Sequence, residues 1–222
     1  MIKKIRYRAK EGQDKWVLDK LNQKENGYFV DIGAASGVNN SNSYILEKYF
    51  NWKGICVEPN PMKRSFQNLQ ANRNCICENL CIYNRSGIVD FVAKGKRIEG
   101  SGIYGDCSNI AIKDLVKNFG YKIIKVPSLT LLELLDKHKA PRTIDYISID
   151  TEGSEWEILK KFNFSRYTFL TMTIEHNYWE GGGWIKKEKV KRDKIRKLLL
   201  ESGYTIDRKL PFEDWLVYEY RC

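Results

Sequence analysis

Short apolar runs recur along the chain, and most are separated by stretches whose apolar residues have helical spacing. Apolar runs of four to eight residues between turn-forming residues are typical of buried strands, and amphipathic stretches are typical of helices. The predicted strands are 28–31, 54–58, 75–82, 88–93, 144–150, 168–175, 203–206 and 215–218. The predicted helices are 13–22, 38–50, one beginning at Pro61, 129–138, 155–162 and 186–199.

Strands and helices alternate through most of this pattern, which predicts a mostly parallel sheet with right-handed crossovers. Between residues 94 and 121 the pattern weakens and glycines accumulate, which favours a long loop over a site. We detect neither a repeat nor a linker. The sequence therefore predicts one α/β domain over residues 1–222, with residues 1–27 as an N-terminal helical extension.

Composition agrees with a globular protein and gives an expectation about the compartment. Of the 222 residues, 42% are hydrophobic and 30% are charged, and no apolar run approaches the roughly 20 residues that span a bilayer. The basic N-terminus lacks the apolar stretch of a signal peptide. The six cysteines form no Cys-x-x-Cys pair, which disfavours a zinc site or a disulfide framework. These features predict an intracellular, cytoplasmic protein.

The most informative motif follows the first predicted strand. It has the form Asp31-x-Gly33-x-Ala35-x-Gly37, and a second apolar run ends in Glu58 about one helix later. A glycine-rich turn allows close backbone approach, and an acid after the next strand accepts hydrogen bonds from a ribose. The spacing differs from the dinucleotide pattern and favours S-adenosylmethionine (SAM), which carries no pyrophosphate. The alternative is a tight strand-to-helix turn that binds nothing.

The formal net charge of +10 raises the question of nucleic-acid binding. Much of this charge lies in 186–199, where Val190, Ile195, Leu198 and Leu199 have nearly helical spacing. We interpret the basic residues as the solvated face of an amphipathic helix rather than as a phosphate-binding surface.

Six motifs, in order between residues 28 and 177, together resemble the FkbM family of SAM-dependent methyltransferases. They are 29–34, 41–43, 52–61, 72–73, 126–130 and 144–155. The resemblance implies a Rossmann-like class I methyltransferase fold, with a mostly parallel seven-stranded sheet flanked by helices. Members of that family are mostly O-methyltransferases that act on hydroxyl groups of sugars and natural products.

The resemblance also implies which residues contact SAM. They are Asp31, Gly33, Ala34 and Gly37 at the methionine end, Ser41 and Asn42 beside it, Glu58 and Pro59 at the ribose, and Asn79 and Leu80 beside the adenine. Ala35 stands where the general class I loop has a glycine, as is common in this family.

Polar residues that follow two later strands are the candidates for catalysis. Asp150, Glu152, Glu175, His176 and Asn177 should meet at the carboxyl end of a parallel sheet. The pKa of a sugar hydroxyl lies far above neutral, so a base or a cation must favour loss of its proton. We expect Asp150, Glu152 and His176 to be catalytic. Asp150 could instead cap the next helix or contact SAM, and His176 could be a structural histidine.

A divalent cation is the alternative to a base. Asp150, Glu175 and Asn177 supply the oxygen ligands that Mg²⁺ or Mn²⁺ prefers, as in catechol-type methyltransferases. In the segment 178–184, aromatic residues flank a run of glycines, which favours a mobile lip that stacks on sugar faces over a loop that only closes the core.

The sequence therefore predicts a SAM-dependent O-methyltransferase whose acceptor is a sugar hydroxyl, within a glycan or a glycosylated metabolite. A nucleic-acid partner and a membrane span are not expected. Two alternatives remain: an RNA ribose methyltransferase, motivated by the net charge, and a non-catalytic module that binds SAM or a nucleoside.

Overall fold

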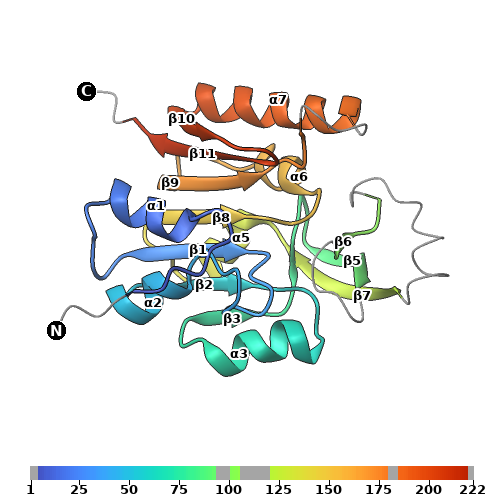
Figure 1. Cartoon of the computed structure of the whole chain (residues 1–222). Helices are drawn as coiled ribbons and strands as arrows, with labels where there is room; N and C mark the ends of the chain where they lie inside the picture. Colours follow the sequence, from blue (N-terminus) through green and yellow to red (C-terminus); the bar gives the residue numbers. More distant parts are fainter. Residues whose placement is uncertain (1–4, 94–100, 106–120, 180–184, 220–222) are drawn as a thin grey trace.

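The computed structural model describes residues 5–93, 101–105, 121–179 and 185–219, which form two sheets with helices packed on the larger one (Figure 1). The larger sheet has the order β10-β11-β9-β8-β1-β2-β3. Its strands are β1 (Tyr28–Ile32), β2 (Lys53–Val57), β3 (Ile76–Glu78), β8 (Thr143–Ile149), β9 (Thr168–Glu175), β10 (Tyr204–Lys209) and β11 (Glu213–Tyr218). Neighbours from β9 to β3 are parallel, whereas β11 runs antiparallel to β9 and β10. The predicted seven-stranded, mostly parallel sheet is confirmed.

Helices cover both faces of this sheet because side chains alternate along each strand. One face carries α1 (Gln13–Lys20), α2 (Tyr44–Phe50) and α3 (Asn68–Asn72), and the other carries α5 (Leu131–Lys137), α6 (Glu155–Leu159) and α7 (Ile185–Glu201). In β1, Phe29 packs in the first group and Val30 in the second. Asp31 therefore points toward α2. Within the described ranges, we find no helix that is both long and apolar enough to cross a membrane.

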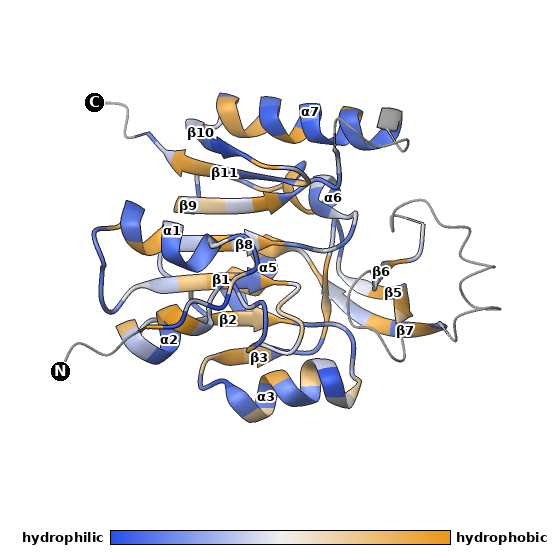
Figure 2. Cartoon of the chain, in the orientation of Figure 1, coloured by the Kyte–Doolittle hydropathy of each residue, from blue (hydrophilic) through white to orange (hydrophobic). Residues whose placement is uncertain are grey.

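The basic helix α7 is present, but its predicted apolar stripe is partly wrong. Ile195 and Leu199 are buried in the core, whereas Val190 is 46% exposed. Figure 2 shows the mixture of polar and apolar residues along this helix. In the first half of α7, the side chain of Lys191 points toward the protein rather than into solvent. It forms ion pairs with Glu155 of α6 (3.0 Å) and with Glu188 (2.9 Å).

A second, four-stranded sheet was not expected from the sequence. It has the order β4-β7-β5-β6, with β4 (Cys81–Ile82), β5 (Gly87–Ala93), β6 (Gly102–Ile103) and β7 (Lys122–Leu129). The predicted strand 75–82 is therefore wrong as a single element, because β3 and β4 belong to different sheets. Asn79 lies at the break, and its side-chain amide donates to the carbonyls of Glu58 (2.8 Å) and Pro59 (3.1 Å).

The pattern of β7 explains why it was missed. Lysines and Pro127 interrupt its apolar residues, and a proline within a run argues against a strand. Pairing with β5 nevertheless packs Val126 against a small core with Phe91 and Ile103. Of the predicted loop 94–121, residues 94–100 and 106–120 lie outside the described residues.

Three predicted helices begin later than the pattern indicated. The helix predicted from residue 38 begins at Tyr44, because the Ser41 hydroxyl accepts the backbone N–H groups of Ser43 (3.3 Å) and Tyr44 (3.1 Å) in a preceding turn. The helix expected at Pro61 begins as a π-helical turn, Lys63–Gln67, which leads into α3. A capping box between Thr130 and Glu133 fixes the start of α5.

Candidate cofactor and acceptor site

A cavity of about 850 Å³ opens at the carboxyl ends of the central parallel strands. Its wall includes Gly33 after β1, Glu58 after β2, Asp150 after β8 and Glu175 at the end of β9. Ligands of open α/β sheets bind at this edge, and the volume lies in the usual range of small-molecule sites.

The turn after β1 requires glycine at position 33. Gly33 has φ +87°, and a Cβ atom built there would lie 1.8 Å from the backbone oxygen of Asp150. The neighbouring hydrogen bonds hold the turn in place: the N–H groups of Gly33 and Ala34 both donate to the carbonyl of Val57 (3.0 Å each). This close approach brings the loop after β1 against the end of β8.

Asp31 is buried at the end of the same strand. It is 3% exposed, and Oδ2 accepts a hydrogen bond from the Ser43 hydroxyl (2.5 Å). Burial raises the pKa of Asp31, although the Ser43 hydrogen bond and the nearby charge of Arg73 oppose this shift. Asp31 thus connects the cavity wall to the start of α2.

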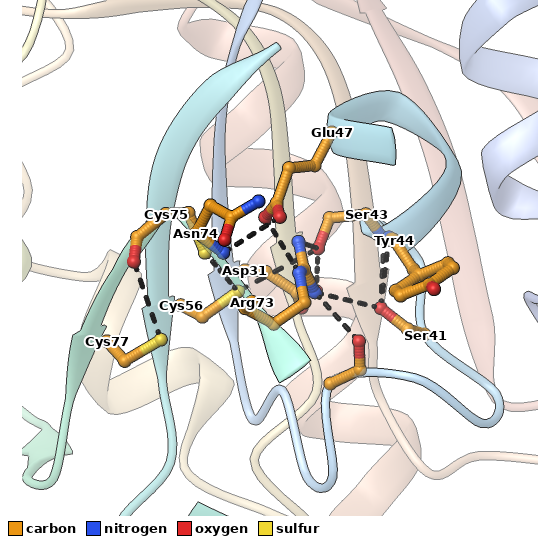
Figure 3. A network of polar contacts seen from close by, with 11 residues as sticks. Asp31, Ser41, Ser43, Tyr44, Glu47, Cys56, Arg73, Asn74, Cys75 and Cys77 are labelled. Carbon is orange, nitrogen blue, oxygen red and sulfur yellow. Dashed lines mark hydrogen bonds and ion pairs between the residues drawn. The ribbon is translucent and has the colours of Figure 1, made fainter. Parts of the chain in front are cut away.

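Arg73, just after α3, holds the loop between β1 and α2 (Figure 3). Its Nη1 donates to the carbonyl of Gly37 (3.0 Å) and to Ser41 Oγ (3.3 Å), and its Nη2 donates to Ser43 Oγ (3.0 Å). Its Nε forms a buried ion pair with Glu47 of α2 (2.8 Å). From the sequence, Arg73 is only part of a family motif, because a single arginine after a helix carries no signal of burial.

Glu58 presents a buried carboxylate to the cavity. Its Oε2 accepts the N–H of Ala35 (2.9 Å) and its Oε1 accepts the N–H of Asn60 (2.8 Å). Burial raises the pKa of Glu58 to about 7, against the effect of these hydrogen bonds. A carboxylate accepts about four hydrogen bonds, so its oxygens can still bind hydroxyl groups.

Most of the residues predicted to contact SAM line this cavity. They are Asp31, Gly33, Ala34, Ser41, Asn42, Glu58, Pro59 and Leu80. Gly37 and Asn79 do not belong to the wall. Gly37 has φ +72° and packs beneath Arg73, where a Cβ atom would lie 2.4 Å from Leu69 Cδ1, and Asn79 fastens the turn after β2.

Asp150 and Glu175 form a carboxyl pair at the ends of β8 and β9, and the two side chains are hydrogen-bonded to each other. Asp150 is open to the cavity, yet the surrounding protein atoms and then the charge of Glu152 raise its pKa to about 7. Burial and the charge of Asp150 raise the pKa of Glu175 as well. Two such close carboxyl groups share a proton near neutral pH.

Glu155 shapes the turn that carries Glu152. Its Oε1 accepts the N–H groups of Thr151 and Gly153 (3.0 Å each), and its Oε2 accepts Lys191 Nζ (3.0 Å). Burial alone would raise the pKa of Glu155, but Lys191 and the N–H of Gly153 hold it below its ordinary value. Glu152 has φ +59° in this turn and lines the cavity.

The sequence of the domain identifies its family. The sequence model of the methyltransferase FkbM domain matches residues 31–206, which include both the loop after β1 and the carboxyl pair. The chain belongs to the FkbM methyltransferase family. It is therefore a SAM-dependent methyltransferase with the Rossmann-like class I fold expected from the sequence.

Several solved methyltransferases resemble this FkbM domain weakly, each with a TM-score of 0.45. The delta-N METTL16 MTase domain is 12% identical, with 93% of this chain and 79% of that one covered. Precorrin-6y C5,15-methyltransferase from Geobacter metallireducens GS-15 is 14% identical (93% and 87% covered), and a human methyltransferase 10 domain containing protein is 13% identical (95% and 82%). No curated protein sequence matches the chain. These similarities do not bear on the acceptor.

His176 does not line the cavity of the FkbM domain, although it was a predicted base. It is 2% exposed; its Nδ1 accepts the N–H of Tyr178 (3.1 Å), and its Nε2 lies 3.8 Å from Asp214 Oδ2. Burial lowers the pKa of His176 to about 4. The structure thus does not bring His176 to the carboxyl pair.

Two of the three predicted metal ligands, Asp150 and Glu175, line the cavity. Asn177 donates its side-chain amide to Glu175 Oε2 (2.9 Å) and is not part of the cavity wall. In the part of the chain that the structure describes, no three His, Cys, Asp or Glu side chains are placed to hold a metal ion.

Segments outside the central strands complete the cavity wall. They include Lys10, Glu11 and Gln13 near the N-terminus, Arg64, Asn68 and Asn72 at and before α3, Phe91 and Ser101–Ile103 at the smaller sheet, and Pro211–Glu213 between β10 and β11. None of these residues was predicted individually, although the segment 94–121 was expected to lie over a site. Gln13 donates to both carboxylate oxygens of Glu213 (2.9 and 3.1 Å), which joins the first segment to the last. Of the predicted lip, residues 180–184 lie outside the described residues.

The close approach at Gly33 predicts a large loss of stability in Gly33→Ala. Gly12 is a matched control, because its φ of +86° is nearly the same but nothing lies within 4 Å of a Cβ atom there. We expect Gly12→Ala to lower the free energy of unfolding by about 1–2 kcal/mol, the cost of the left-handed conformation. Gly33→Ala should lower it by about 3 kcal/mol or more. Urea denaturation compares them, and equal losses would contradict the close approach.

Proposed function

We propose that this domain transfers the methyl group of SAM to a hydroxyl group of a sugar, and that the Asp150–Glu175 pair receives the hydroxyl proton. The carboxyl pair in the cavity wall is the observation that carries this proposal. A base with a pKa near the working pH is the most effective proton acceptor, and the pKa of Asp150 is about 7. Glu152, in the adjacent turn, is a further carboxylate that can bind the acceptor.

The residues of the cavity fit SAM. Glu58 offers unoccupied carboxylate lone pairs for ribose hydroxyl groups, and Asp31 with the loop after β1 would hold the methionine end. Leu80 supplies an apolar surface beside the adenine. Bound SAM supplies an electrophilic methyl group, so the protein needs to position an acceptor oxygen and take up its proton.

The charge of the cavity wall supports a neutral, hydroxyl-rich acceptor. Among the described residues of the wall, seven are acidic and two are basic: Glu11, Asp31, Glu58, Asp150, Glu152, Glu175 and Glu213 against Lys10 and Arg64. Carboxylates accept hydrogen bonds from hydroxyl groups and repel phosphates. The RNA alternative therefore has weaker support, although the whole chain carries a net charge of +10.

A divalent cation remains the alternative to proton uptake by the carboxyl pair. Asp150 and Glu175 already bind each other, and Asn177 presents its amide N–H to Glu175. We therefore expect methyl transfer to continue in excess chelator. Activity that stops in chelator and returns with Mg²⁺ or Mn²⁺ would replace this proposal with the metal-assisted one.

The function itself is tested with methyl-labelled SAM and a panel of glycans, deoxysugar glycosides and RNA. We expect label on a sugar hydroxyl, located by mass spectrometry of the product. Label in RNA would support the ribose alternative, and SAM binding without transfer to any acceptor would support a non-catalytic module.

Glu58→Gln should weaken SAM binding by about 1–3 kcal/mol, because a charged acceptor of ribose hydrogen bonds becomes neutral. Since the pKa of Glu58 is about 7, its carboxylate is mostly protonated below that pH and ionised above it. The difference in affinity between wild type and variant should therefore grow as pH rises from 6 to 8 (about one pKa unit either side). Titration calorimetry at both pH values measures it, and equal affinities would remove the ribose role.

Asp150→Asn should reduce kcat by about 10²–10⁴-fold with little change in SAM affinity, since a general base is lost. In the wild type, kcat should fall as pH decreases through about 7, where Asp150 becomes protonated and the pair gains its second proton.

Asp150→Asn should increase the stability of the folded protein, although it lowers kcat. A carboxyl group whose pKa is raised by folding destabilises the folded state once pH exceeds its unfolded pKa. Asp150→Asn should thus raise Tm at pH 8 and change it little at pH 4.5. An active variant, or a lower Tm at pH 8, would contradict the assignment.

A further inference from the structure

Two exposed aromatic rings meet at the rim of the cavity. Phe212 lines the cavity and is 47% exposed, and Trp179 is 51% exposed. Their ring centroids are 6.3 Å apart, and the ring planes are inclined by 47°. Large apolar side chains left in water beside a binding cavity are typical of recognition surfaces. We call Phe212 and Trp179 the aromatic corner.

The backbone at the aromatic corner adopts an unfavourable conformation. Phe212 has φ +76°, which is rare for a bulky residue. Hydrogen bonds hold it there: the carbonyl of Phe212 accepts the N–H groups of His176 (2.6 Å) and Asn177 (3.1 Å), and its N–H donates to the carbonyl of Tyr178 (3.2 Å). Such strain persists where the surroundings enforce it and is concentrated at functional sites. The strain here is not compensated by burial of the ring.

The segment that carries Trp179 is also held by a contact with α7. The guanidinium of Arg192, on α7, lies 4.2 Å from the ring centroid of Tyr178. Arg192 is buried, so this contact belongs to the packed part of the structure rather than to the rim. Trp179 and Phe212 are thus presented by two segments that are joined by backbone hydrogen bonds.

The neighbouring charges indicate what binds at the aromatic corner. Glu213 follows Phe212 and lines the same cavity, as do Glu175 and Asp150. A pyranose ring has apolar C–H faces that pack on aromatic rings and hydroxyl edges that donate to carboxylates. A nucleobase could also stack on these rings, but its phosphates would meet the acidic wall.

We propose that the aromatic corner is the acceptor subsite, where Phe212 and Trp179 bind the C–H face of a pyranose ring whose hydroxyl groups face the carboxylates of the cavity. This inference rests on the proposed function and deepens it, because it names the residues that select the acceptor. Deoxygenated sugars, whose faces are more apolar, should bind better there than their fully hydroxylated counterparts.

The first test measures steady-state kinetics with a methylated sugar acceptor from the panel. Phe212→Ala and Trp179→Ala should each raise KM for the sugar by about 10-fold, whereas Phe212→Tyr and Trp179→Phe, which keep a ring, should change it by less than about threefold. SAM affinity should be unchanged in all four variants. Tyr49→Ala is the control, because Tyr49 is 45% exposed on α2 and is not part of the cavity wall.

Phe212→Gly tests whether the Phe212 ring serves sugar binding or the packing of the folded protein. Glycine adopts φ +76° without strain, so a ring that serves only recognition can be removed without a lower Tm. We expect Phe212→Gly to keep or raise Tm and to raise KM for the sugar as Phe212→Ala does. A lower Tm with unchanged KM would assign Phe212 to packing and overturn the proposal.

A binding measurement without SAM distinguishes the failure of this inference from the failure of the proposed function. Titration of the wild-type protein with the sugar should change tryptophan fluorescence, and Trp179→Phe should remove most of that change. If no sugar is methylated, the proposed function fails. If sugars are methylated but the corner variants keep the wild-type KM and fluorescence response, only the aromatic corner is wrong. Loss of RNA binding in those variants, with sugar kinetics unchanged, would instead indicate base stacking.

Discussion

The contact between Gly33 and the backbone of Asp150 controls the geometry of the whole site. Asp150 donates its N–H to the carbonyl of Ile32 (3.0 Å), and the missing Cβ of Gly33 lets the next residue turn across the end of β8. This single crossing places the loop that would hold the cofactor against the carboxylate that would receive the acceptor proton. A displacement of about 1 Å between such groups is enough to lower a rate substantially.

Acidic residues predominate in the cavity wall, although the protein as a whole is basic. Basic side chains of α7 neutralise buried acids that are not part of the cavity wall. Lys191 pairs with Glu155, and Arg196 binds Asp214 through two hydrogen bonds (2.7 and 2.8 Å). On the opposite face, Arg73 plays the same part for Glu47. The described acids of the cavity wall outnumber its basic residues, so the cavity stays acidic within a basic protein. Net charge alone is therefore a poor guide to the acceptor.

The peripheral segments give the cavity its shape. The central strands supply the polar groups, but the N-terminal segment, the smaller sheet and the turn between β10 and β11 supply walls, including Phe91, Ile103 and Phe212. These walls come from loops and short strands around a rigid sheet, where changes in sequence alter recognition at little cost to the fold.

The sequence by itself determined the alternation of strands and helices, the seven-stranded sheet, the family, and several of the residues that line the cavity after β1 and β2. These features depend on local periodicity and on motifs whose spacing is short. Tertiary structure alone decided the rest. The smaller sheet depends on pairing between β5 and β7, which lie far apart in the sequence, and the role of Arg73 depends on partners contributed by other elements. His176 follows Glu175 directly, yet Glu175 lines the cavity and His176 is buried beside Asp214, because neighbouring residues at the end of a strand point in different directions.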